Sequence, residues 1–160
     1  MAEFCSRAAE KLRRQQSLTG CITVFIRTSP FNPNEPQYQR TASIKLDAAT
    51  QDTRAIITMA NRLLREIFRQ GYNYQKCGVQ LSQLQPEASP GQLELFAFAG
   101  NGLPAENRPL MKVVDQINRR FPKAISVAAT GLDQTWKAKA ERISPRYTTN
   151  WRELVSVKCG

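Results

Sequence analysis

The sequence predicts an α+β fold: a sheet backed by two helices on one face, then a linker and a small C-terminal α/β appendage. Segments with helical and alternating apolar periodicity follow each other in the order helix, strand, strand, helix, strand. A stretch containing Pro, Ser and Glu then interrupts the pattern at residues 85–90. Hydrophobic residues make up 41% of the 160 residues, which suffices for a core.

The first helix is expected at residues 3–15, where Phe4, Ala8 and Leu12 recur every four residues. Gly20 is expected to break this pattern. Two strands rich in β-branched residues follow, at 21–27 and 40–46, joined by a proline-stiffened connection.

The second helix is expected to begin at Asp52 and to end before Gly71. A third strand is expected at 74–81. The apolar stripe of the second helix contains Ile56, Ile57, Ala60, Leu63, Leu64, Ile67 and Phe68.

Alternation along the strands assigns each side chain to one face of the sheet. The helices would cover Ile22, Val24, Ile26, Ala42, Ile44, Leu46, Cys77, Val79 and Leu81. The other face would display Thr23, Phe25, Arg27, Thr41, Ser43, Lys45, Lys76 and Gln80. Such an open face suits phosphate oxygens, which accept hydrogen bonds from basic and hydroxyl groups. An ordinary solvated face is the alternative that the pattern leaves open.

After the linker, a helix is expected at 109–120 and a strand at 124–129. The apolar stripe of this helix contains Leu110, Val113, Val114 and Ile117. Residues 134–160 have weak periodicity, and Trp136, Arg146 and Trp151 fit either a core or a contact surface.

Charge is the most informative bulk property. Lys and Arg number 23 against 13 Asp and Glu, a net charge of +10. This excess favours polyanions such as nucleic acid, although solubility alone also accounts for it. No run approaches the length of a membrane span and the N-terminus lacks signal-peptide features, so we expect a cytoplasmic protein with no membrane partner.

Cofactor and metal sites are not expected. The sequence contains no histidine, and its four cysteines form no CxxC pair. This excludes zinc sites built from Cys and His and argues against a disulfide framework. Reduced thiols remain the expectation.

Several runs resemble the UmuC-type Y-family error-prone DNA polymerase subunits. The runs 8–13 (AAEKLR), 25–31 (FIRTSPF) and 74–79 (YQKCGV) are similar to the little-finger domain of that family. The run 143–151 (ISPRYTTNW) resembles the family's extreme C-terminal segment. Between them, 92–96 (QLELF) matches the QLxLF peptide with which such polymerases grip the sliding clamp.

The resemblance implies three parts: a little-finger-like DNA-binding domain at 1–84, a linker with the clamp-binding peptide at 85–108, and a UmuC-type C-terminal segment at 109–160. The family's sheet has four strands, and we expect the first to be missing here. The expected DNA contacts are Arg27, Thr28, Ser29, Thr41, Ser43, Lys45 and Lys76. The expected clamp contacts are Gln92, Leu93, Leu95 and Phe96.

The function expected from this resemblance is a noncatalytic module that binds duplex DNA and the sliding clamp during translesion synthesis in the SOS response. The family's catalytic palm has no counterpart in the sequence, and the acidic residues are too scattered for two-metal nucleotidyl transfer. The family also implies a UmuD-type subunit and RecA as partners. The alternative is a regulatory fragment that occupies the clamp or the RecA filament without supporting synthesis.

Overall fold

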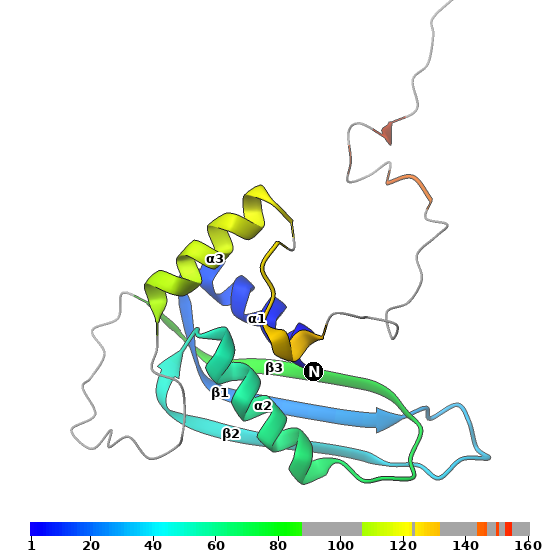
Figure 1. Ribbon diagram of the computed structural model, residues 1–160. Helices are drawn as coiled ribbons and strands as arrows, with labels where there is room; N and C mark the ends of the chain where they lie inside the picture. Colours follow the sequence, from blue (N-terminus) through cyan, green and yellow to red (C-terminus); the bar gives the residue numbers. More distant parts are fainter. Residues whose placement is uncertain (88–106, 123, 132–143, 147–149, 151–152, 155–160) are drawn as a thin grey trace, which may run out of the picture.

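The computed structural model describes residues 1–87, 107–122, 124–131, 144–146, 150 and 153–154. The observed order of helices and strands confirms the α+β class (Figure 1). The elements are α1 (Ala2–Arg14), β1 (Ser17–Thr28), β2 (Gln39–Thr50), α2 (Thr53–Ile67), β3 (Tyr74–Pro86), α3 (Arg108–Arg120) and the 3-10 turn η1 (Ala128–Thr130).

The sheet has three antiparallel strands in the order β2-β1-β3. Strand β1 is central, so its side chains alternate between the two faces of the sheet. Its helix-facing residues Ile22, Val24 and Ile26 are buried. Both α1 and α2 lie on this face, as expected (Figure 1). Among the residues that the structure describes, no helix covers the opposite face.

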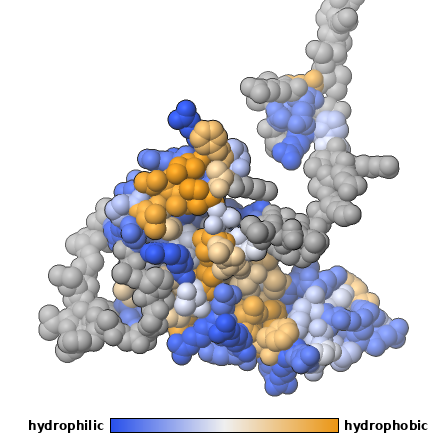
Figure 2. All heavy atoms as spheres, viewed as in Figure 1, coloured by the Kyte–Doolittle hydropathy of each residue, from blue (hydrophilic) through white to orange (hydrophobic). Residues whose placement is uncertain are grey.

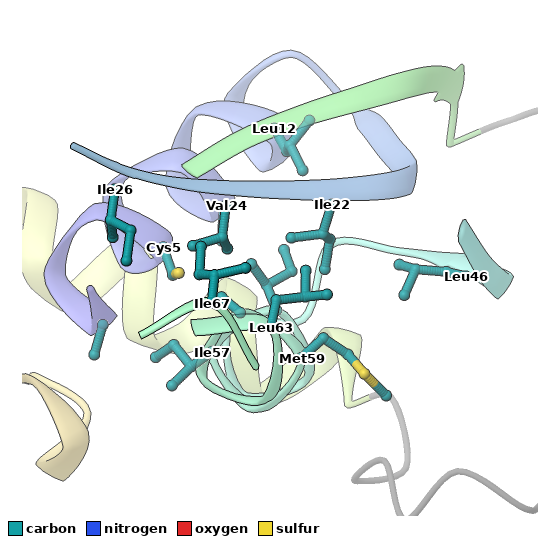
Figure 3. Packing of buried hydrophobic residues seen from close by; sticks show 14 residues of the cluster. Cys5, Leu12, Ile22, Val24, Ile26, Leu46, Ile57, Met59, Leu63 and Ile67 are labelled. Carbon is teal, nitrogen blue, oxygen red and sulfur yellow. The ribbon is translucent and has the colours of Figure 1, made fainter. Parts of the chain in front are cut away.

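The core lies between β1 and the two helices. Figure 3 shows Ile22 and Val24 pointing from the sheet toward Leu63 and Ile67 of α2. Full burial of each such side chain stabilises the fold by about 1.5–3 kcal/mol. Helix α2 begins where the sequence predicts, because the Asp52 carboxylate caps it by accepting a hydrogen bond from the Arg54 N–H at 2.8 Å.

The expected core stripe of α1 was only partly right. Leu12 is buried, but Phe4 and Ala8 are only half-buried. The fully buried positions are Cys5 and Ala9. These two are small, and small residues let a helix approach its neighbours closely. The buried stripe of α1 therefore runs through Cys5, Ala9 and Leu12.

The three described cysteines are free thiols. Burial raises the pKa of the Cys5 thiol to about 11, an effect partly offset by the N-terminal charge and a backbone hydrogen bond. Cys21 is half-buried. Cys77 is exposed, although its partner across the strands, Ile26, belongs to the core.

The strands are longer than expected. Gly20 does not end the first helical pattern but lies within β1, where the register against β2 shifts between Thr19 and Cys21. An isolated glycine in a strand often marks such an irregularity. Strand β3 continues to Pro86, so the last two residues pair with β1 instead of opening the linker.

Helix α2 ends earlier than expected. Its last residue is Ile67, and Phe68 has extended backbone angles and is 54% exposed. Gly71 lies in the connection to β3, where its φ of 91° favours glycine. Tyr38 takes part in this end of the helix, because its hydroxyl donates to the Ile67 carbonyl at 2.7 Å.

The expected strand at 124–129 is not formed. Its apolar segment instead leads into η1. The side chain of Asn118 both accepts from the Ile125 N–H at 2.9 Å and donates to the Ile125 carbonyl at 2.8 Å. These bonds satisfy backbone groups that a neighbouring strand would otherwise satisfy.

Helix α3 begins one residue before the expected start and is capped by the Asn107 side chain, which accepts from the Leu110 N–H at 3.0 Å. Its buried residue is Met111, whereas Leu110 and Val113 of the expected stripe are exposed. No helix in the described part of the chain is long and apolar enough to cross a membrane.

Candidate nucleic-acid interface

The open face of the sheet is organised in rows that cross all three strands. Cross-strand pairing places Ser43 and Gln80 on either side of Thr23. The next outward row runs through Phe25, and the one after it through Arg27. Every second residue of β1 therefore lies on this face together with its partners on β2 and β3.

A hollow lies on this face. It is lined by Thr23, Phe25, Arg27, Gln39, Thr41, Lys76 and Gln80. None of these residues is acidic. The hollow therefore offers two cations, hydroxyls and amides around an aromatic ring, which are the groups that bind phosphate oxygens and pack on sugars.

Gly78 makes room for the ring of Phe25. Gly78 pairs with Phe25 across β1 and β3, and a Cβ at position 78 would lie 2.4 Å from Phe25 Cζ. No real contact is that short, so the ring occupies space that only glycine leaves free. The Phe25 ring therefore lies over Gly78 on the open face of the sheet.

Arg27 and Lys76 are direct cross-strand partners on the open face. Like charges placed opposite each other in a sheet destabilise it. An anion bound between them would remove this repulsion. This pairing is the most specific electrostatic feature of the candidate interface.

Lys45 lies at the other end of the open face. It pairs with Cys21, six residues before Arg27 along β1. At about 3.3 Å per residue the two basic positions are about 20 Å apart. Measured along the helix axis of B-form DNA, that span corresponds to about six phosphates of one strand.

Five of the seven residues proposed as DNA contacts lie on the open face of the sheet. Arg27, Thr41 and Lys76 line the hollow. Ser43 lies beside it, within 2.8 Å of the Thr23 hydroxyl, and Lys45 lies beyond it.

The remaining two residues, Thr28 and Ser29, do not lie in the hollow. Thr28 is buried; its hydroxyl donates to Gln37 Oε1 at 2.9 Å and accepts from the Tyr38 N–H at 3.0 Å. Ser29 belongs to the connection between β1 and β2, where its hydroxyl accepts from the Phe31 N–H at 3.4 Å. Both residues therefore shape this connection.

Gln39 was missed as a member of the interface. It lines the hollow and pairs with Arg27 from the β2 side. The signal was present in the sequence, because Gln39 shares its parity with Thr41 and Ser43. The expected start of β2 at position 40 excluded it.

A second polar cluster joins α3 to the helices of the sheet domain. Asp115 accepts two hydrogen bonds from Arg13, from Nε at 2.6 Å and from Nη2 at 2.7 Å. The remaining nitrogen, Nη1, donates to the Gln51 carbonyl and the Thr53 hydroxyl, each at 2.9 Å. The side chains of Arg13 and Asp115 are only 9% and 14% exposed. We call this ion pair the clasp.

Asp52 adds a further link between α2 and α3. Its carboxylate accepts from the Arg54 guanidinium at 2.7 Å and from the Asn107 N–H at 3.3 Å. Burial raises the pKa of this carboxyl, but hydrogen bonds from Arg54 and Asn107 and the Arg54 charge outweigh that effect and leave the pKa below its usual value. The carboxylate therefore stays ionised at neutral pH.

Glu87 and Arg108, which stand on either side of the segment 88–107 that contains the peptide proposed to bind the clamp, lie close together. Arg108 Nη1 is 3.8 Å from Glu87 Oε1, and both residues lie beside the clasp. Residues 92–96, with the proposed clamp contacts Gln92, Leu93, Leu95 and Phe96, lie outside the described residues. Among the residues that are described, no group of three or more Cys, Asp or Glu side chains is placed to hold a metal ion.

A three-stranded sheet with two helices on one face and an open basic face on the other defines the chain as a little-finger-type domain. Residues 1–95 match the model of the impB/mucB/samB family C-terminal domain, and residues 108–157 match the domain of unknown function DUF4113. The chain belongs to this family, as the C-terminal part of the UmuC-type Y-family polymerases.

Relatives with both regions cover nearly the whole chain. Protein UmuC of Salmonella typhimurium is 40% identical over 156 residues, which are 97% of this chain and 36% of that protein. Protein MucB of Escherichia coli is 41% identical over 151 residues, 94% of this chain and 35% of the relative. Protein ImpB of Salmonella typhimurium is 37% identical over 162 residues, 100% of this chain and 37% of the relative. The chain thus spans little more than a third of the relatives' length.

Proposed function

We propose that the chain is a noncatalytic module that holds duplex DNA on the open face of its sheet and docks on a sliding clamp through residues 92–96. In this proposal it serves an error-prone translesion polymerase of the SOS response. Contacts with a UmuD-type subunit and with RecA are part of the same proposal and rest on the family alone.

The DNA-binding part of this proposal rests on one observation. Arg27 and Lys76 are direct cross-strand partners in a hollow that no acidic residue lines. The repulsion between these side chains lowers stability and serves no purpose in the free domain. A phosphate between them would turn repulsion into two charge-assisted hydrogen bonds. The neighbouring hydroxyls of Thr41 and Ser43 would extend the contact along the backbone.

Recognition of this kind does not depend on base sequence. The cationic and hydroxyl groups of the open face suit phosphates and sugars, which carry no sequence information. Binding should therefore be weak, similar for unrelated duplexes and strongly salt-dependent.

The test reverses charge at the two ends of the face. The Arg27→Glu/Lys45→Glu variant should weaken duplex binding and flatten the salt slope by up to about two units, about one per lost phosphate contact. The matched control is Lys11→Glu/Arg65→Glu, which changes the net charge equally at exposed positions of α1 and α2. An interface on the sheet requires the control to keep nearly the wild-type slope. Equal losses in both variants would mean that only the overall charge matters.

A separate assay addresses catalysis. Primer extension with Mg²⁺ and all four nucleotides should give no product above that of a mock-purified sample. Extension by this chain alone would contradict a noncatalytic role.

A further inference from the structure

Four aromatic side chains gather where α2 ends. We call Tyr38, Phe68, Tyr72 and Tyr74 the aromatic cluster. The ring centres of Tyr72 and Tyr38 are 4.7 Å apart, and those of Phe68 and Tyr74 are 5.4 Å apart. Tyr38 and Tyr74 meet edge to face, with their ring centres 6.0 Å apart. The four rings therefore form one connected group.

Two of the rings are fixed by the fold. Tyr38 and Tyr74 pack against the core. The Tyr38 hydroxyl donates to the Ile67 carbonyl at 2.7 Å. The Tyr74 hydroxyl donates to the Arg69 carbonyl at 2.8 Å and accepts from the Arg69 N–H at 3.0 Å. These bonds satisfy backbone groups at the end of α2 and hold the two rings in place.

The other two rings, Phe68 and Tyr72, present aromatic surface to solvent. Phe68 is 54% exposed, and Tyr72 is half-buried. Each of them rests on one of the fixed rings, so its position is also defined. Figure 2 shows hydrophilic residues, in blue, around a small hydrophobic area beside the lower end of α2.

Two arginines give the cluster a positive charge. The Cζ atoms of Arg40 and Arg69 lie 5.9 Å and 5.5 Å from the centre of one ring of the cluster. Within the part of the chain that the structure describes, neither guanidinium pairs with a carboxylate. The acidic residues nearest to the cluster in the sequence are Glu35 and Glu66, and Glu66 pairs with Arg62 at 3.8 Å.

The cluster and the hollow lie at the same end of the sheet, on opposite faces. Tyr38 directly precedes Gln39, which lines the hollow beside Arg27. Successive residues of an extended chain point to opposite faces, and Tyr38 packs against the core on the helix side. A DNA strand that leaves the hollow past Arg27 would therefore meet the cluster around the end of the sheet.

We propose that the aromatic cluster binds unpaired bases of single-stranded DNA. Bases stack on exposed aromatic rings and on guanidinium planes with little regard to sequence, because every base has a π-face. Arg40 and Arg69 would also attract the phosphates on either side of a stacked base. The choice of DNA rests on the proposed function, since the single strand would continue from a duplex on the open face.

Two single-stranded probes test this proposal on the full chain. One is a labelled oligothymidylate, and the other is an abasic oligonucleotide of the same length, which carries the same phosphates without bases. In fluorescence anisotropy at one salt concentration, the wild-type chain should bind the oligothymidylate about tenfold more tightly. Phe68→Leu/Tyr72→Leu should remove this preference, because leucine keeps an apolar side chain but has no aromatic face. Phe31→Leu is the matched control, because Phe31 is 91% exposed in the connection between β1 and β2 and should keep the preference when changed.

A duplex titration separates this inference from the proposed site on the open face. Arg27→Glu/Lys45→Glu should weaken duplex binding and keep the preference for the probe that contains bases. Phe68→Leu/Tyr72→Leu should have the reverse effects. Failure of the duplex site alone would thus leave the base preference in place.

Two results would overturn the proposal. The first is equal binding of the two single-stranded probes by the wild-type chain. The second is the same preference for bases in Phe68→Leu/Tyr72→Leu as in Phe31→Leu. Circular dichroism shows whether each variant keeps its helices. If the double variant loses them, Phe68→Leu alone, at an exposed position, gives the same comparison.

Discussion

The guanidinium of Arg13 spans the junction between α1, α2 and α3, and Asp115 of α3 accepts two of its hydrogen bonds. Arg13 lies in the region that matches the impB/mucB/samB family C-terminal domain, and Asp115 in the region that matches the domain of unknown function. The ion pair thus joins two regions that separate family models describe. Within the described part of the chain, the sheet domain and α3 form one structure.

Breaking the clasp should cost more than breaking an exposed ion pair. Asp115→Ala would leave the nearly buried Arg13 without its carboxylate, and we expect the free energy of unfolding to fall by about 2–3 kcal/mol. Urea denaturation measures this loss. The control is Glu66→Ala, which breaks the exposed pair of Arg62 with Glu66 and should cost less than about 0.5 kcal/mol. Similar midpoints for the two variants would show that the clasp contributes little to stability.

Asp52 should make the stability of the protein sensitive to acid. Its folded-state pKa lies below the ordinary value of 3.8, so its ionised form stabilises the fold above that value. The contribution is lost as pH falls through the lowered folded-state pKa. Asp52→Asn keeps a helix-capping side chain but removes this titration. The stability difference between wild type and variant should therefore shrink below about pH 4, and a constant difference from pH 7 to pH 2 would contradict this account.

We expect Lys76 to lower the stability of the free domain and to strengthen DNA binding. Lys76→Glu replaces the repulsive pair with an attractive one across β1 and β3, and should stabilise the domain by about 0.2–1 kcal/mol at low salt. The same change should weaken duplex binding. Thermal melts and DNA titrations on one preparation would measure both effects. A loss of stability would show that Lys76 and Arg27 do not repel each other in the free domain.

We expect substitutions of Gly78 and Phe25 to have coupled effects on the stability of the domain. A methyl group at position 78 would collide with the Phe25 ring, so Gly78→Ala should destabilise the domain by about 1–2 kcal/mol. After Phe25→Ala the same substitution should cost much less, because the colliding ring is gone. A double-mutant cycle measures this coupling. Additive effects would mean that the ring moves aside freely.

The peptide proposed to bind the clamp, residues 92–96, gives the sharpest functional test. Leu95→Ala/Phe96→Ala should abolish binding to the sliding clamp, because each buried anchor typically contributes about 2 kcal/mol or more, roughly thirtyfold in affinity. Fold and DNA binding should be unchanged. Phe31→Ala removes a phenylalanine that is exposed in the connection between β1 and β2, and serves as the control. Normal clamp binding by the double variant would refute the motif, and unfolding would place Leu95 and Phe96 in the core.

Local patterns predicted most of the sheet domain. The Asp52 cap and the apolar period of α2 located this helix to within a few residues. The alternation of Ile22, Val24 and Ile26 gave the correct face of β1. Because side-chain parity follows directly from strand geometry, it also located most of the candidate interface.

These local patterns could not predict contacts between residues that are far apart in the sequence. Nothing in the helical period of α3 reveals that Asp115 pairs with Arg13, 102 positions away, and this pair decides which side of α3 is buried. Leu110 and Val113 consequently looked like core residues. The bonds from Asn118 to the backbone of Ile125 likewise replaced an expected strand with a turn.

The clasp also has a consequence for the order in which the protein folds. Arg27 pairs with Gln39 only twelve positions away, whereas the clasp closes a chain of 102 residues. The entropy of loop closure makes the longer contact about 2 kcal/mol more costly to form. The hairpin of β1 and β2 would then form before α3 docks, and backbone amides of α3 should exchange with solvent faster than those of β1. A transient release of this helix would uncover Met111 while the sheet stays intact.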